Sequence, residues 1–332
     1  MKTLQITAHL GGGVGKAVAG IIKLSPDDCE TKVALLDVPN DLKWVDKVKE
    51  YGCEVLPYEE RLSSWADIIV FNWWDCKTVN DFLKDFKKPD IPLVAWLHNN
   101  CFYPPIDDSA IFPLADGFFF TTPLSFEHPH VGKKGILVYG YGDFRPEKIV
   151  PKVDYALKDT FNIGYCGTPS FKKLRPDCMN YYKSVLEVIP NAIFTFVGDT
   201  NDEFKDALFE AGIADKCRVL GKLTDCIEEI RNFDVCGFLI SDTTFAATEN
   251  ALFETMAMGI PSLMPTKPLG KYFKGAIKVN SPAEFAKEVL KLYQSETLRK
   301  QIGESGREWV LKEVNADKTA NIFYDTLKGM VK

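Results

Sequence analysis

Short apolar runs alternate with stretches of helical periodicity along most of the chain. In the first half, the runs that predict strands are 4–8, 33–36, 68–71, 93–97, 118–121 and 136–139. After a break, the pattern continues with runs at 162–166, 193–197, 218–220, 235–240, 262–264 and 276–279. Nearly continuous apolar strands separated by helices are typical of a parallel sheet with helices on both faces. The pattern therefore predicts an α/β protein with two doubly wound, Rossmann-like domains.

A change in composition separates the two halves. The stretch "YGYGDFRPEKIVPKVDY", 139–155, combines glycines, prolines and charges of both signs, as linkers between domains do. We predict a first domain at 1–148 and a second at 149–332, since 332 residues can form two cores. The capping box Ser281-Pro282-Ala283-Glu284 begins a helix, and two further helical stretches are candidates to pack back on the first domain. Two such domains facing each other form a cleft, where we expect the ligand.

Charge and cysteine content narrow the class of function. A net charge of −6, without a block of lysines and arginines, argues against a nucleic-acid partner. Nine cysteines without a C-x-x-C pair, and without an apolar signal segment, predict reduced thiols in a cytoplasmic protein. No stretch approaches the roughly 18 apolar residues of a transmembrane segment. Peripheral membrane contact stays open, because it requires only a surface patch.

The glycine cluster "HLGGGVGKAVAG", 9–20, lies between a strand-like and a helix-like run. Backbone N–H groups bind anions at such turns. The cluster misses two of the four fixed positions of a Walker A loop. A dinucleotide fingerprint fits Gly11 and Gly13, but this chain has Lys16 where the fingerprint requires a third glycine. Asp37 follows at about the sequence distance of a ribose-binding acid. An oxidoreductase that uses a dinucleotide, and a tight turn without a ligand, are the alternatives here.

The most specific stretch is "ENALFETMAMGIPSLM", 249–264. Thr248 can cap a helix here and Gly259 can end it. Asn250 and Glu254 are four residues apart and so share one face of that helix. A carboxylate one turn into a helix suits the hydroxyls of a ribose or sugar, while the helix N-terminus attracts a phosphate. The alternative is that both side chains are simply solvated.

This stretch resembles the glutamate signature of the retaining glycosyltransferases of family 4, or group 1, which have the GT-B fold. "GYCGTPSFKKLRP", 164–176, and "IPNAIFTFVGD", 189–199, are similar to the first two strands of that family's second domain. "RVLGKLTDCIEEIRNFDVCGFL", 218–239, resembles the segment whose loop frames the nucleotide base. The glycine cluster is similar to the first-domain loop beside the donor. The resemblance thus spans nearly the whole chain.

The resemblance implies an enzyme that transfers a sugar from a nucleotide-diphosphate sugar to an acceptor hydroxyl with retention of anomeric configuration. The second domain would bind the donor and the first the acceptor; the donor is a co-substrate, and no other cofactor is implied. No Asp-x-Asp occurs, which fits a transferase that uses lysines and helix dipoles rather than a metal. The implied donor-binding residues are Gly12, Gly13, Thr168, Lys172, Lys173, Arg175, Leu223, Asn250 and Glu254.

Two departures from the family pattern bear on activity. Where the family has an arginine that binds the diphosphate, this chain has Thr168, so Lys172 or Arg175 would have to compensate beside Lys173. The first carboxylate of the family's Glu-x7-Glu pair is replaced by Ala246. Glu249 and Asp242 are nearby acids at other spacings. The sequence leaves open an active transferase, a donor sugar held by backbone N–H groups, or a nucleotide-sugar-binding protein without turnover.

His98 follows a first-domain strand and matches a family histidine that approaches the donor sugar, so we predict His98, Glu254 and Glu249 as catalytic residues. A structural hydrogen bond at the strand end is the alternative for His98. His9 ends the first strand and could flank the same cleft. His128 and His130 are spaced for a metal, but no third ligand is evident. We therefore predict that the site contains no metal.

Aromatic residues suggest a saccharide acceptor. Trp73 and Trp74 follow a first-domain strand, and Asn99 follows His98 at the neighbouring strand end. Flat rings stack on sugar faces, so these three residues are the predicted acceptor contacts. Ordinary packing of aromatic side chains beneath a loop is the alternative.

Overall fold

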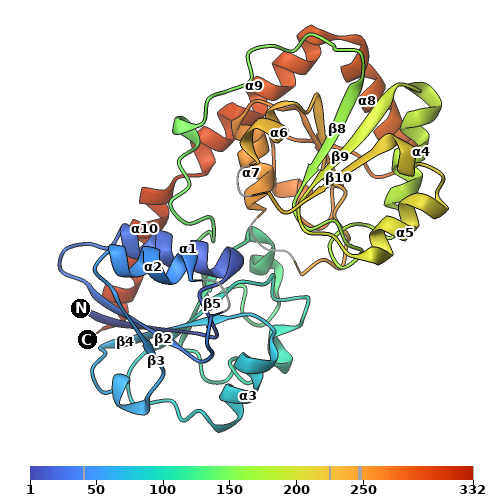
Figure 1. The fold of residues 1–332 in the computed structure, drawn as a ribbon. Helices are drawn as coiled ribbons and strands as arrows, with labels where there is room; N and C mark the ends of the chain where they lie inside the picture. Colours follow the sequence, from blue (N-terminus) through green and yellow to red (C-terminus); the bar gives the residue numbers. More distant parts are fainter. Residues whose placement is uncertain (40–41, 224–225, 246–248, 332) are drawn as a thin grey trace. The chain divides into compact units, whose positions relative to one another are not determined.

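The computed structural model describes residues 1–39, 42–223, 226–245 and 249–331. The chain forms two compact units, each with its own parallel sheet (Figure 1). The first unit contains Met1–Phe144 and Asn315–Lys332, and the second contains Arg145–Thr244 and Glu249–Val314. The predicted Thr248 cap and the Ala246 position lie outside the described residues.

The first unit is built on a seven-stranded sheet in the order β3-β2-β1-β4-β5-β6-β7. All of its strand pairs are parallel. The strand order reverses between β1 and β4, and ligands of doubly wound sheets bind at such points, beyond the carboxyl ends of the strands. The strands are β1 (Lys2–Thr7), β2 (Glu30–Leu35), β3 (Glu54–Pro57), β4 (Ile68–Trp73), β5 (Leu93–Leu97), β6 (Gly117–Phe120) and β7 (Gly135–Leu137).

Six of these strands are confirmed close to their predicted bounds, and β3 was not predicted. It lies at the edge of the sheet, and both Glu54 and Pro57 are exposed. An edge strand needs no continuous apolar run and tolerates proline, so its sequence carries little strand signal. The short 3-10 helices of this unit are η1 (Glu60–Leu62), η2 (Ile106–Asp108) and η3 (Pro123–Glu127).

Helices cover both faces of this sheet. On one face, α1 (Gly12–Lys23) and α2 (Lys43–Glu50) share an apolar core with α10 (Ala316–Met330), and α3 (Lys77–Asp85) packs on the other. Helix α10 comes from the end of the chain, yet Tyr324 donates a hydrogen bond to the carbonyl oxygen of Ile21 at 3.1 Å. The last helix therefore belongs to the first unit.

The second unit is built on a six-stranded parallel sheet in the order β10-β9-β8-β11-β12-β13. All six strands were predicted, but β11 is shorter than the predicted run 235–240, because Ile240 has left the sheet to bridge Leu174. The strands are β8 (Phe161–Cys166), β9 (Ala192–Val197), β10 (Cys217–Gly221), β11 (Val235–Gly237), β12 (Ser262–Met264) and β13 (Ile277–Lys278).

Two helix ends of the second unit lie where the sequence predicts them. The hydroxyl of Ser281 accepts a hydrogen bond from the N–H of Glu284, which confirms the predicted cap. Gly259 follows α7 with φ +77°, a conformation that favours glycine. The helices are α4 (Cys178–Val188), α5 (Asp202–Glu210), α6 (Ile227–Arg231), α7 (Asn250–Ala257), α8 (Pro282–Gln294) and α9 (Glu296–Glu313), with η4 (Pro146–Lys148), η5 (Ala214–Lys216) and η6 (Gly270–Tyr272).

Candidate functional site

In the second unit, the loop after β8 carries Lys173 to the start of α7. The loop is fixed to the segment that follows β11, because Arg175 N donates to Leu239 O at 2.9 Å and Ser241 N donates to Lys173 O at 2.8 Å. Lys173 Nζ then lies 3.2 Å from Oε2 of Glu249, the residue that precedes α7. Backbone pairing thus brings together an ammonium and a carboxylate that are distant in sequence.

Glu249 is an unusual carboxylate, because its side chain is only 1% exposed. Its Oε2 faces Lys173, while its Oε1 is buried without a hydrogen-bond partner among the described residues. A buried acceptor without a donor costs about 1–3 kcal/mol. Burial, and secondarily the charge of Glu249, raise the pKa of the neighbouring Tyr165 well above its usual value. Within the described residues, Oε1 of Glu249 is thus an acceptor whose hydrogen bond is unmet.

Asn250 and Glu254 lie on α7, and both are half-buried. The charge of Glu254 is felt by Cys166, the last residue of β8. The pKa of the Cys166 thiol is raised by a hydrogen bond with the Cys226 thiol, by burial and by the Glu254 charge. The two glutamates of this segment and Lys173 thus lie around the carboxyl end of β8. This is the end of a parallel sheet at which ligands bind.

The other predicted donor residues differ in what they can do. Thr168 and Lys172 are exposed, and Leu223 is half-buried. The guanidinium of Arg175, in contrast, donates from Nε to Asp177 Oδ1 at 2.9 Å. Its Nη1 also lies 3.8 Å from Asp242.

These ion pairs leave two predictions open. Arg175 pairs with Asp177, much as Lys173 pairs with Glu249, so its part in replacing the arginine missing at Thr168 stays a prediction. Asp242 lies 3.8 Å from Arg175 and is exposed, so its part in replacing the carboxylate missing at Ala246 stays a prediction too.

In the first unit, His98 stands just past the end of β5. Its Nε2 lies 3.0 Å from Asn72 Oδ1, and Asn72 Nδ2 donates to Gln5 Oε1 at 3.0 Å. Desolvation lowers the pKa of His98 to about 3, so the ring is neutral at physiological pH. His98 is therefore an uncharged hydrogen-bonding group. Sequence reasoning missed Gln5 and Asn72, although a polar residue within each of two apolar strands was a visible signal.

The two adjacent tryptophans have different roles. Trp73 is 1% exposed in the core of the first unit, so the predicted stacking of its ring on a sugar is wrong. Strand geometry is the reason, because successive side chains point to opposite faces. Trp74 is half-buried, with ring centroids 5.4 Å from His9 and 6.4 Å from His98. Asn99 is also buried. Of the three predicted acceptor contacts, Trp74 is therefore the one with an accessible side chain.

The glycine cluster is a helix start rather than a loop, because α1 already begins at Gly12. Gly12 has φ +54°, and Gly12 and Gly13 are exposed in the first turn. The N–H of Gly11 donates to Nδ1 of His9 at 3.0 Å. Asp37, the acid of the dinucleotide alternative, accepts a hydrogen bond from Thr78 at 3.3 Å.

His128 and His130 both face Asp107, at 3.4 and 3.1 Å from its Oδ2. Burial lowers the pKa of His128, and the charge of Asp107 opposes that shift. Within residues 1–39, 42–223, 226–245 and 249–331, no group of three or more His, Cys, Asp or Glu side chains is arranged to bind a metal ion. His128, His130 and Asp107 form a polar cluster of the first unit.

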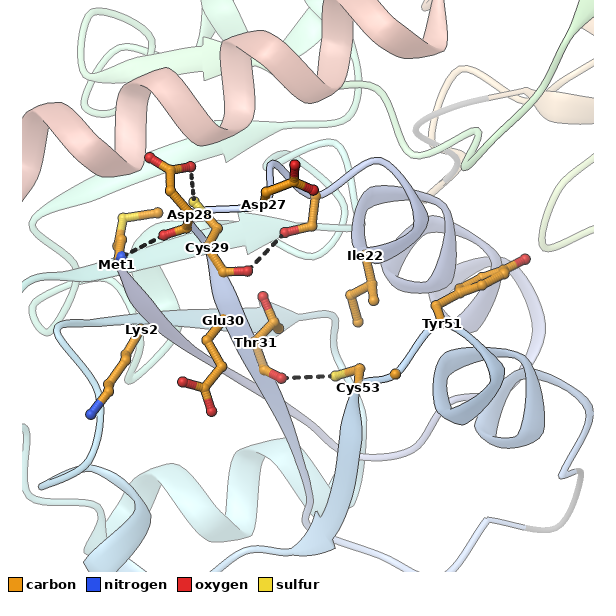
Figure 2. A pocket seen from close by; sticks show the side chains of 12 residues that line it. Met1, Lys2, Ile22, Asp27, Asp28, Cys29, Glu30, Thr31, Tyr51 and Cys53 are labelled. Atoms are coloured by element: carbon orange, nitrogen blue, oxygen red, sulfur yellow. Dashed lines mark hydrogen bonds between the residues drawn. The ribbon is translucent and has the colours of Figure 1, made fainter.

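Figure 2 shows a hollow in the first unit that contains none of the predicted site residues. It lies at the amino ends of β1 and β2, where Cys53 Sγ donates to Thr31 O at 3.1 Å. Because parallel sheets bind ligands at the opposite edge, the hollow supplies no candidate active site. It is lined by Met1, Lys2, Ile22, Ser25, Asp27, Asp28, Cys29, Glu30, Thr31, Tyr51, Gly52 and Cys53.

Comparison with solved structures identifies the fold. HepE from Anabaena, solved in complex with UDP-glucose, superposes with a TM-score of 0.76 at 14% identity over 99% of this chain and 100% of that one. A glycosyltransferase from Rickettsia africae gives 0.71 at 13% identity, covering 100% of this chain and 98% of that one. Sucrose-phosphate synthase from Thermosynechococcus elongatus gives 0.69 at 14% identity, covering 99% and 98%. The chain therefore has the predicted GT-B fold.

The other comparisons add no family assignment. No protein-family model matches the chain, and no curated protein matches it. Across the described residues, no helix combines the length and the apolar character needed to cross a membrane.

Proposed function

We propose that the protein is a retaining glycosyltransferase of family 4 that moves a sugar, such as a hexose, from a nucleotide-diphosphate sugar to an acceptor hydroxyl, with a saccharide as acceptor. The observation that carries this proposal is the ion pair of Lys173 with the buried Glu249, whose second carboxylate oxygen meets no donor in the described part of the chain. The fold shared with glycosyltransferases, one of them solved with UDP-glucose, supports it.

In this proposal, Lys173 binds the diphosphate of the donor. Its ammonium is 20% exposed and held in place by Glu249, so it is oriented before the ligand arrives. Negative charge grows on the diphosphate as the bond to the sugar breaks, and a fixed ammonium and the N-terminus of α7 both stabilise that charge. This arrangement requires no metal, so a chelator is expected to leave transfer intact.

The α7 carboxylates would bind hydroxyl groups of the donor. Glu254 accepts from the ribose or sugar diol, with Asn250 beside it, and Glu249 Oε1 accepts from a sugar hydroxyl. Glu249 would thereby replace the carboxylate that the family has where this chain has Ala246. In the first unit, His98 binds a hydroxyl of the sugar and Trp74 stacks on the acceptor.

A thermal-melting panel tests this function. Uridine, guanosine, adenosine and thymidine diphosphates and their sugars are titrated; a ligand at 100 times its dissociation constant stabilises the fold by about 2.7 kcal/mol. The matching nucleoside serves as the control without phosphates. A shift with a nicotinamide dinucleotide and with none of the diphosphates would instead identify an oxidoreductase.

One observation favours a second candidate, a nucleotide-sugar-binding protein without turnover. Ala246 stands where the family has a carboxylate beside the reacting carbon. The test supplies the donor found by melting with a broad acceptor panel and follows the anomeric configuration by NMR. A product with retained configuration supports the transferase, whereas tight donor binding with neither transfer nor donor hydrolysis supports the binding protein.

We also propose a cytoplasmic location. All nine cysteines are free thiols, which suits a reducing compartment. Fractionation of cells that express the chain, with a membrane wash at high salt, distinguishes this from peripheral membrane attachment.

A further inference from the structure

Three side chains from neighbouring strands form a buried polar row at the carboxyl end of the first sheet. Gln5 lies on β1, Asn72 on β4 and His98 just after β5, and these three strands are adjacent. Gln5 and Asn72 are both 0% exposed. Asn72 is the centre of the row, because it contacts both of the others.

The orientation of the Asn72 amide follows from a backbone carbonyl. Asn72 Nδ2 lies 3.3 Å from Ile6 O, which can only accept a hydrogen bond, so the NH2 group must face β1. Its second proton goes to Gln5 Oε1 at 3.0 Å. Oδ1 is left to face His98 Nε2 at 3.0 Å. Because an amide oxygen only accepts, Nε2 must be the donor of this hydrogen bond.

The ring carries a single proton, because desolvation lowers the pKa of His98 to about 3. The residue is half-buried, and its ring centroid lies 4.8 Å from that of Trp96 and 6.4 Å from that of Trp74. With the only proton on Nε2, the other nitrogen, Nδ1, has a lone pair. Which nitrogen carries the proton in a neutral histidine is set by the partner of the other one.

We propose that Asn72 is a positioning residue that fixes His98 with its proton on Nε2, so that Nδ1 accepts a hydrogen bond from a sugar hydroxyl. This inference rests on the proposed function for the role of the sugar. It makes a specific claim about selectivity: the group facing Nδ1 must be a donor, so a donor sugar deoxygenated at that position loses the contact.

The hydrogen-bond assignment can be tested on the free protein. Nitrogen-15 NMR of histidine-labelled protein resolves four rings, and His98→Gln identifies the signals of His98. We expect a protonated Nε2 and an unprotonated Nδ1 for His98 at pH 7, without titration between pH 5 and 8. A proton on Nδ1, or an imidazolium at pH 7, would overturn the proposal.

Substitution of Asn72 tests its role in turnover. Asn72→Ala removes the acceptor, and transfer should fall roughly tenfold, equivalent to about 1.4 kcal/mol, while UDP affinity stays within about twofold. Asn72→Asp places a carboxylate beside Nε2 and favours the imidazolium, which has no acceptor at Nδ1. Transfer by Asn72→Asp should therefore decline as the pH falls through the raised pKa of His98, an inflection that wild type lacks.

Controls separate this inference from the proposed function. Asn180→Ala removes an exposed asparagine of α4 and should leave transfer and the His98 signals unchanged. Asn72→Ala adds no charge and keeps the test available if Asn72→Asp does not fold. Wild-type transfer in Asn72→Ala overturns the positioning role alone. The expected tautomer in a protein that transfers no sugar from any donor overturns the proposed function and, with it, the role of Asn72.

Discussion

Replacement of Lys173 by alanine should have two separable effects, one on donor binding and one on stability. The ammonium is the proposed ligand of the diphosphate, and a hydrogen bond to a charged group contributes about 1.5–3 kcal/mol. Its loss should weaken binding of the nucleoside diphosphate identified by the melting panel, for which UDP is the first probe, roughly 10- to 150-fold. The same ammonium forms the ion pair with Glu249, which is 1% exposed.

The stability effect follows from that burial. Removing one partner of a buried ion pair costs about 3–5 kcal/mol, because the remaining charge is left uncompensated. Lys173 is 20% exposed, so water reaches this pair and we expect a value near the lower end. Lys173→Ala should therefore unfold at a lower denaturant concentration than wild type, by about 3 kcal/mol in the free energy of unfolding.

A double variant separates the two effects. Glu249→Gln keeps the size of the side chain but removes its charge, so Lys173→Ala/Glu249→Gln should recover most of the lost stability. It should not recover UDP affinity, because the ammonium is still absent. Calorimetric titration with UDP and urea unfolding measure the two quantities on the same samples. Lys183→Ala, which removes an exposed lysine of α4, is the matched control and should change neither.

Two results would refute the reasoning. Wild-type UDP affinity in the double variant would show that Lys173 is not a phosphate ligand and would return it to an ordinary loop lysine. Equal stability of Lys173→Ala and wild type would show that Glu249 is not held as a buried charge.

Three further predictions concern other parts of the molecule. Glu254→Ala should weaken binding of UDP by about 1–3 kcal/mol through lost ribose contacts while uracil binding is unaffected, and equal UDP affinity in calorimetry would contradict this. The pKa of His98 is 6.5 in the unfolded chain and about 3 in the folded protein, so the unfolded state binds more protons between these values. The free energy of unfolding should therefore fall as the pH is lowered through this window, by up to about 1.4 kcal/mol per pH unit. Urea unfolding of wild type and His98→Gln across that window checks the sign, and parallel curves would refute it. Arg299 is 1% exposed and donates from Nε and Nη2 to Tyr155 O at 3.1 and 2.6 Å. Arg299→Met leaves that buried carbonyl without these donors and should lower the free energy of unfolding by several kcal/mol in urea unfolding. Lys300→Met, at an exposed neighbour, is the control and should not lower it.

The residues of the candidate site were singled out where they fall on recognisable local motifs, and their roles stay predictions. Asn250 and Glu254 come from one helical stretch, and Lys173 comes from its match to a loop of the resembled family. Gln5 and Asn72 were missed, since each is a single polar letter in an apolar strand and their contact joins residues 67 apart. Trp73 and Trp74 were predicted to have the same role, and one step of strand alternation separates them, which a run of apolar residues buried on both faces does not reveal.

The sequence by itself determined twelve of the thirteen strands that the structure describes, several helix ends and hence the two α/β units, because those features depend on residues within a few positions of one another. The run of apolar residues in β5, the Ser281 cap and the glycine after α7 all act locally. Only the tertiary structure decided that Lys173 pairs with Glu249, that Arg175 is taken by Asp177, and that α10 returns to the first unit. Those outcomes depend on contacts between segments that are distant in the sequence. The stability that an ion pair or a buried apolar face contributes is set only when its partner is in place.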